Sequence, residues 1–423
     1  MWCTPHYGTL GIVCCIALLG LRFIPFDIVS EKWKRRLRTP WVQWLPSTWF
    51  LTPQLIRHST TSLYLRFICT IGQILFPLML LFGWQWMDLL SHYELVRKDM
   101  EQWPIERLDD SIKELAHSPP GIRADWHGVR IMGNTAIVTC EQRPRLMAFD
   151  LTSDKRSETP LHQRWGMENV GPLESEVNPR NSIVWTVNGG KHILESKLHN
   201  GQWTRYREVR LPSTLSFSYM TRSTDTLFMM EVQTGGNEGS RKLVTAPLPQ
   251  LRPITELNLT MNGSKAPMPR EPLWVPTIQK LVYGSEFGNL LYAIEMKDGA
   301  VSPWLEADTF NGKMAWSDGT QRIYSAVPNK MQIQVIDPTI PAIEHTLWTQ
   351  PGVRSLAVDE QRNLIVSASV LTGQIWVQDA ENGSVLKRMG TVYPMVREIA
   401  LAEELGIGVL TTWNAVYQFK YID

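Results

Sequence analysis

The chain has 423 residues, and its 42 basic and 41 acidic side chains give a formal net charge of +1. This balance provides no general attraction to nucleic acid, so we predict no nucleic-acid partner. Of the five cysteines only Cys140 follows residue 69, so the C-terminal region cannot contain an internal disulfide. No cysteine or histidine pair has the spacing of a zinc site.

Two apolar segments, residues 8–28 and 67–90, lie near the start of the chain. The second is long enough to cross about 30 Å of hydrocarbon, and the first has an uncharged centre. We predict that both are transmembrane helices within a membrane region that covers residues 1–90. A cleaved signal peptide is the alternative for the first segment, but no basic stretch precedes it and no small-residue cleavage site follows it.

The loop between these segments is rich in tryptophan and in basic residues. Its basic residues include Lys32, Lys34, Arg35, Arg36 and Arg38. Because basic loops stay in the cytoplasm, we predict a multi-pass protein of the cytoplasmic membrane with both termini on the periplasmic or extracellular side. Residues 91–120 have partial helical spacing and are predicted to form a helical neck.

Short alternating runs, punctuated by Asp, Asn, Gly and Pro, fill the rest of the chain and predict strands and tight turns. One apolar position recurs in what we take as the second strand of each repeat, at intervals of 41 to 54 residues. These positions are Ile137, Ile183, Leu227, Leu281, Ile323, Leu364 and Ile407. The period is typical of four-stranded propeller blades, and we predict that residues 121–423 form a seven-bladed β-propeller.

Two details of the ring follow from this repeat. The longest interval contains a polar run at about 233–272, which we expect to be a long loop. The chain ends after the third strand of the last blade, so we predict that residues just before Trp126 supply the missing outer strand and thereby close the ring.

The last repeats resemble bacterial surface propellers built of YVTN repeats and, more loosely, WD40-like propellers. The resemblance is carried by residues 333–338 with 343–347 and by residues 375–385, which match a strand, an Asp turn and a returning strand. The YVTN tetrapeptide itself and the Gly-His and Trp-Asp marks of WD40 blades are absent. The resemblance therefore implies a propeller fold and no particular activity.

Motifs of catalysis are absent from the sequence. There is no GxSxG, HExxH, phosphate-binding loop or EF-hand loop, and the tryptophan-docking signature of quinoprotein propellers is present only in part, in one repeat. We predict no catalytic residue, no metal site and no cofactor.

Aligning the repeats brings four basic residues into one position. The residue ten places before each anchor is His127, Leu173, Phe217, Glu271, Lys313, Arg354 and Arg397. Because a ring places the last three beside His127, we predict that His127, Lys313, Arg354 and Arg397 form a basic arc at the mouth of the central channel that binds an anionic ligand or protein partner. The alternative is a set of solvated strand-end charges, partly neutralised by Asp318, Asp359 and Glu398.

These patterns favour a membrane-anchored, non-enzymatic propeller that displays an interaction surface outside the cytoplasm. One alternative is an exported propeller hydrolase or lactonase with a site in the central channel. Another is an accessory subunit of a membrane complex that docks through its two spans.

Overall fold

The computed structural model describes a series of segments in the C-terminal three quarters of the chain. These are residues 106–107, 111–118, 126–140, 145–161, 174–188, 190–215, 218–231, 241–285, 289–307, 312–390 and 396–422. The chain divides into the units Met1–Trp103 and Pro104–Asp423, and all described residues belong to the second. In these segments no helix is long and apolar enough to span a bilayer. The predicted spans, 8–28 and 67–90, and the five basic residues between them lie outside the described segments.

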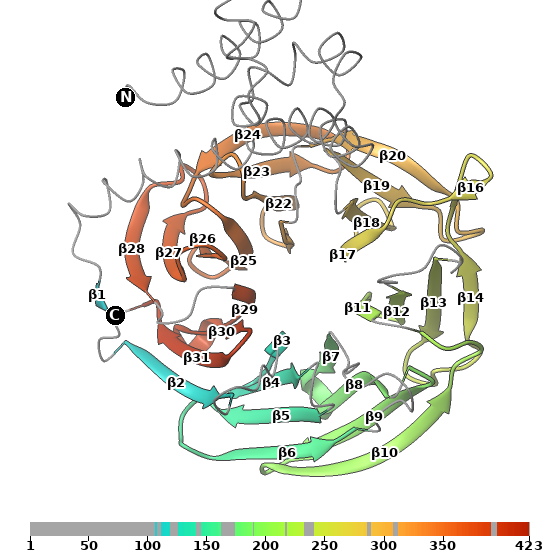
Figure 1. Cartoon of the computed structure of the whole chain (residues 1–423), viewed down its shortest axis with the longest axis horizontal. Helices are drawn as coiled ribbons and strands as arrows, with labels where there is room; N and C mark the ends of the chain where they lie inside the picture. Colours follow the sequence, from blue (N-terminus) through green and yellow to red (C-terminus); the bar gives the residue numbers. More distant parts are fainter. Residues whose placement is uncertain are drawn as a thin grey trace, which may run out of the picture. The chain divides into compact units, whose positions relative to one another are not determined.

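The second unit is a ring of seven antiparallel sheets, the blades of a β-propeller (Figure 1). Blade 1 contains β3 (Trp126–Met132), β4 (Thr135–Cys140), β5 (Arg145–Asp150) and β6 (Arg156–Pro160). Blade 2 contains β7 (Ser175–Asn178), β8 (Ile183–Asn188), β9 (His192–His199) and β10 (Gln202–Arg210), with a 3-10 turn at Pro179–Asn181. Blade 3 contains β11 (Ser218–Arg222), β12 (Thr226–Glu231), β13 (Lys242–Pro247) and β14 (Thr255–Asn258).

The other four blades follow the same order from the centre outward. Blade 4 contains β17 (Pro269–Val275), β18 (Lys280–Ser285), β19 (Leu290–Ile294) and β20 (Val301–Glu306). Blade 5 contains β21 (Met314–Ser317), β22 (Arg322–Val327), β23 (Gln332–Asp337) and β24 (Ala342–Trp348). Blade 6 contains β25 (Val353–Asp359), β26 (Leu364–Ser369), β27 (Gln374–Asp379) and β28 (Val385–Gly390). Blade 7 contains β29 (Val396–Ala402), β30 (Ile407–Thr412), β31 (Ala415–Lys420) and β2 (Ile112–His117), with a 3-10 turn at Glu403–Leu405.

The seven anchors lie in the second strands of the blades, as predicted. Each anchor is at most 8% exposed. The second strands β8, β26 and β30 are buried at every position, because a strand inside a blade is covered by neighbouring blades on both faces. Outer strands such as β10 expose most of their residues. The apolar pattern of the second strand is therefore the strongest sequence signal of the fold.

The ring closes as the sequence predicted. Strand β2 pairs antiparallel with β31, so that a segment before Trp126 completes the blade formed by the C-terminus. The predicted helical neck is consequently wrong for Ile112–His117, because pairing with an otherwise open edge outweighs weak helical spacing. Further upstream, β1 (Glu106–Arg107) pairs in parallel with β28 and adds a fifth strand to blade 6.

The long loop predicted at about 233–272 is also corrected by the structure. It contains β13 and β14, which are the ordinary outer strands of blade 3, and the first residues of β17. The insertion itself includes a short hairpin of β15 (Thr260–Met261) and β16 (Ser264–Lys265). Polar composition hid β14 because this outer strand is at least partly exposed at all four positions.

Apolar clusters between adjacent blades form the core. The cluster between blades 6 and 7 contains Val366 and Ile375 on one side and Leu410 and Phe419 on the other. A second cluster joins blade 7 to blade 1 through Val409, Val416 and residues around Trp126. Burial of one such side chain stabilises the fold by about 1.5–3 kcal/mol. The apolar seams therefore hold the inner strands in fixed positions around the centre.

Candidate functional site: a charged cluster at the centre of the ring

The four residues of the predicted basic arc all lie on or beside inner strands. His127 is on β3, Arg354 on β25 and Arg397 on β29, and Lys313 directly precedes β21. Burial, followed by the positive charges of Arg397, Arg354 and Lys313, holds the pKa of His127 well below its usual range. The ring therefore brings these four side chains within electrostatic reach of one another, with the imidazole neutral at neutral pH.

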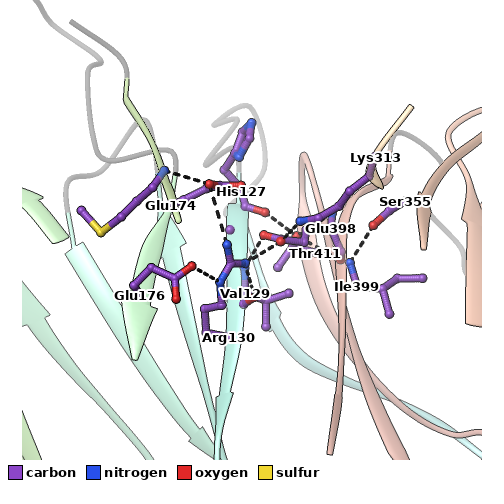
Figure 2. Close-up of polar contacts among 12 residues, drawn as sticks. His127, Val129, Arg130, Glu174, Glu176, Lys313, Ser355, Glu398, Ile399 and Thr411 are labelled. Carbon is purple, nitrogen blue, oxygen red and sulfur yellow. Dashed lines mark hydrogen bonds and ion pairs between the residues drawn. The ribbon is translucent and has the colours of Figure 1, made fainter. Parts of the chain in front are cut away.

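Glu398, on β29, is the carboxylate that Lys313 and Arg130 share (Figure 2). Its side chain is only 4% exposed. Arg130 Nη1 lies 2.5 Å from Glu398 Oε1, and the backbone N–H of Val129 donates to Oε2 at 2.8 Å. Lys313 belongs to blade 5, Arg130 to blade 1 and Glu398 to blade 7. Glu398 therefore connects blade 7 with its neighbour, blade 1, and with blade 5, which is adjacent to neither of them.

Arg130 extends this network toward blades 2 and 3. Its Nε lies 3.0 Å from Glu176 Oε1 and its Nη2 lies 3.8 Å from Glu174 Oε2. Glu174 also accepts a hydrogen bond from the backbone N–H of Met220 at 3.0 Å. Burial opposes the charge on Arg130, but Glu176 and Glu174 outweigh it and raise the pKa of the guanidinium. We call the set His127, Arg130, Glu174, Glu176, Lys313, Arg354, Arg397 and Glu398 the central cluster.

Three buried polar atoms in and beside the central cluster have no hydrogen-bond partner among the described residues. They are His127 Nδ1, Arg354 Nε and Glu271 Oε2. Glu271 lies in a β-bulge of β17 and has a φ of 39°, in the left-handed region that a glutamate rarely adopts. Buried polar atoms are normally paired, so these three groups are available for hydrogen bonds to a bound molecule.

Ion pairs and pKa shifts connect a group of cations and carboxylates at the centre. The cations are Arg130, Arg222, Arg270, Lys313, Arg354 and Arg397, and the carboxylates are Glu174, Glu176, Glu271 and Glu398. Beside them, the ring centroid of Tyr219 lies 6.3 Å from that of His127, and burial raises the pKa of Tyr219 to about 12. The site therefore presents several guanidinium and ammonium groups together with neutral phenol and imidazole groups, a set that suits a carboxylate or phosphate.

The neutralising residues proposed from the sequence have different roles. Only Glu398 is seen to pair with the basic arc among the described residues. Asp318 accepts a hydrogen bond from Trp316 Nε1 at 2.6 Å, and Asp359 accepts from Arg362 Nη1 at 2.9 Å and from the Tyr421 hydroxyl at 2.8 Å. Burial, together with the hydrogen bond to Asp359, raises the pKa of Tyr421.

Sequence reasoning named Glu398 as a neutralising residue but missed Arg130, Glu174 and Glu176. Glu174 and Glu398 both stand nine residues before their anchors, one place after the basic arc, and Arg130 and Glu176 stand seven before theirs. The repeat alignment shows these charged residues one to three positions after the position of the basic arc. No described group of three or more His, Cys, Asp or Glu side chains is arranged to hold a metal ion.

Comparisons with known proteins identify the fold. No family model and no curated protein matches the sequence. A catalytically inactive variant of virginiamycin B lyase from Staphylococcus aureus, in complex with quinupristin, is similar in structure, with a TM-score of 0.56 and 12% identity over 74% of this chain and 99% of that one. A streptogramin B lyase has a TM-score of 0.55 with 12% identity over 73% of this chain and 96% of that one. The β-propeller domain of Cps50 (Swd1) from Myceliophthora thermophila has a TM-score of 0.52 with 11% identity over 73% of this chain and 99% of that one. The chain is therefore a seven-bladed β-propeller, a fold that both lyases and the Swd1 domain share.

Proposed function

We propose that this protein is a non-enzymatic binding propeller whose central cluster holds an anionic group of a protein partner. The observation that carries the proposal is the group of partly buried cations around His127, with His127 Nδ1 and Arg354 Nε unpartnered among the described residues. A carboxylate placed there would accept hydrogen bonds from Arg354 and lower the repulsion among the cations. The absence of catalytic motifs from the sequence favours binding over chemistry.

We further propose that two N-terminal spans anchor the propeller in the cytoplasmic membrane. Residues 8–28 and 67–90 supply the apolar length, and the basic loop between them indicates that the propeller lies on the periplasmic or extracellular side. A C-terminal tag tests this arrangement, because it should be digested by protease added outside intact cells stripped of any outer envelope. Protection of the tag until the cells are lysed would contradict the orientation.

The binding proposal is tested with an acidic probe. A fluorescent hexaglutamate peptide should bind the full-length protein in detergent, and the double variant Arg354→Gln/Arg397→Gln should weaken binding at least tenfold because two cations of the site are lost. Arg322→Gln is the matched control, since Arg322 pairs with Glu344 on the outside of blade 5. Equal affinities of the wild-type and double-variant proteins would refute the site.

An exported hydrolase or lactonase remains the second candidate. It is favoured by one observation, the buried and neutral His127 whose Nδ1 has no partner among the described residues, because an imidazole of depressed pKa can act as a general base. Hydrolysis of a panel of lactones by the purified protein, lost in His127→Gln, would support this function. A subunit role in a membrane complex predicts instead that residues 1–90 alone co-purify with partners.

A further inference from the structure

Among the described residues, four inner strands carry a β-bulge, and each bulge contains the residue ten places before the anchor of its blade. In β25 and β29 the extra residue is Arg354 or Arg397, and in β3 and β17 the bulge contains His127 or Glu271. A bulge kinks its strand and re-aims the side chain at that position, and bulges are frequent beside binding sites. The bulges therefore set the directions of these four side chains apart from the regular pleat of the inner strands.

Glu271 is the acidic member of this set. Its φ of 39° is in the left-handed region, which a residue with a Cβ rarely adopts. Its side chain is half-buried, and no hydrogen bond or ion pair joins its carboxylate to another described residue, the preceding Arg270 included. Such backbone conformations persist only where the surrounding structure holds them, and they cluster at binding sites. Glu271 is therefore placed to contact a ligand.

Arg354 is a cation in the same situation on a different blade. No hydrogen bond or ion pair of its guanidinium is formed with another described residue. Blade 5 separates β25, which carries Arg354, from β17, which carries Glu271 (Figure 1). The two charges share one environment, since after burial both act on the pKa of the Tyr219 phenol, which Glu271 raises and Arg354 lowers. Lys313, the cation of blade 5, is already paired with Glu398. A bound molecule that carries both signs of charge can therefore pair with Glu271 and Arg354 at once.

Resting on the proposed binding function, we infer that the central site takes a zwitterion, a group in which an ammonium lies a few bonds away from a carboxylate. The ammonium pairs with Glu271 and the carboxylate with Arg354, so that both charges gain a partner. Glu271 is thus a specificity-determining residue, because it stabilises a positive charge that a plain carboxylate lacks. The N-terminus of a polypeptide that begins with an acidic residue has this chemistry, and so does a free amino acid.

The test compares peptides that differ in one charge. Glu-Ala-Ala-Ala amide carries an ammonium and a carboxylate at pH 7, and its N-acetylated form keeps only the carboxylate. In isothermal titration calorimetry on the full-length protein in detergent, acetylation should weaken binding about tenfold, equivalent to about 1.4 kcal/mol. In Glu271→Gln the two peptides should bind equally, because the charge that distinguishes them is gone.

Two further variants serve as checks. Glu271→Gly should also lose the preference for the free amine, and because glycine adopts a positive φ freely, misfolding cannot explain that loss. The matched control is Glu344→Gln, which removes a carboxylate from the outside of blade 5 and should leave the preference unchanged.

A second pair of probes distinguishes the two sources of a zwitterion. γ-Aminobutyrate has the same number of bonds between its ammonium and its carboxylate as an N-terminal glutamate, and butyrate lacks the ammonium. Tighter binding of the peptide than of γ-aminobutyrate identifies a polypeptide N-terminus as the ligand, and the reverse identifies a free amino acid.

Equal binding of the free and acetylated peptides by wild-type protein, or an unchanged preference in Glu271→Gln, would overturn the zwitterion site. If Arg354→Gln still weakens binding of the acetylated peptide, the anion-binding function stands without it. Absence of saturable binding by both the free peptide and γ-aminobutyrate would also overturn the zwitterion site, and the hexaglutamate peptide then decides whether the anion site exists.

Discussion

Neighbouring blades meet through apolar side chains, whereas the inner strands meet across the centre through charges. In the seams, the side chains of Val366, Leu410 and Phe419 are fully buried. Each stabilises the fold because its apolar surface is removed from water. At the centre, Glu398 is almost as deeply buried, but it is stabilised only because Lys313 and Arg130 are there to pair with it. Burying charge is costly even when the pairing is good, so the centre contributes less to stability than its contacts suggest.

This difference separates what the two regions do. A seam can accept many apolar combinations if volume is kept, so it stabilises the ring without specifying a ligand. The central cluster contains charged groups and some polar atoms that lack a hydrogen-bond partner among the described residues. A ligand that supplies those partners would bind more tightly because of this arrangement. The following variants test whether the division between a stabilising seam and a binding centre is correct.

Loss of the C-terminal strand β31 should have the largest effect. Deletion of residues 415–423 removes β31, the strand between β30 and β2, and with it Val416 and Phe419 of two seams. We expect no cooperative thermal unfolding by circular dichroism, because blade 7 loses its link to the N-terminal segment.

Phe419→Ala tests the same strand with a single substitution and should lower the free energy of unfolding by about 3–5 kcal/mol. Lys420→Ala, at an exposed position of the same strand, should change stability by less than about 0.5 kcal/mol. Equal stability of the Phe419 and Lys420 variants would contradict the seam model.

Breaking the central network should have a slightly smaller effect on stability. Glu398→Gln removes the carboxylate that Lys313 and Arg130 share and leaves two buried cations without it, at a cost of about 3–5 kcal/mol in urea unfolding. Glu344→Gln is the control, since Glu344 pairs with Arg322 in a solvent-accessible position and should cost less than about 1 kcal/mol. Adding Lys313→Met to Glu398→Gln should recover part of the loss, and additive losses in the double variant would show that the two side chains do not interact.

The buried His127 should make stability depend on pH. Its folded pKa is depressed by burial and by Arg397, Arg354 and Lys313, whereas the unfolded histidine has the usual value of about 6.5. Below that value the unfolded state binds a proton that the folded state does not bind. The free energy of unfolding therefore decreases as the pH is lowered. The slope from this residue is at most about 1.4 kcal/mol per pH unit.

His127→Gln is the variant that isolates this effect, because the Thr411 hydroxyl bonds to the backbone carbonyl of residue 127 and not to its side chain. Between pH 7 and 5 the variant should lose less stability in urea than the wild-type protein. His345→Gln, in a mostly exposed part of β24, serves as the control and should leave the pH dependence unchanged. Identical slopes for wild-type and His127→Gln proteins would mean that His127 has the same pKa in the folded and unfolded states.

The sequence by itself determined the number of blades, the second-strand anchors and the closure near Trp126. These features follow from short-range rules, since a strand covered on both faces must be apolar along its length, as in residues 364–369 and 407–412. It also placed His127, Lys313, Arg354 and Arg397 in equivalent positions of their repeats.

Only the tertiary structure decided which charges meet. Lys313 and Glu398 are separated by a whole blade in the chain and pair because the ring curves them toward one centre. The strand at Ile112–His117 was decided in the same way, because its partner β31 lies about 300 residues away and local spacing carries no information about such a partner. Local sequence patterns therefore predict which residues are buried. Which residues pair across the centre depends on how the seven blades close into a ring.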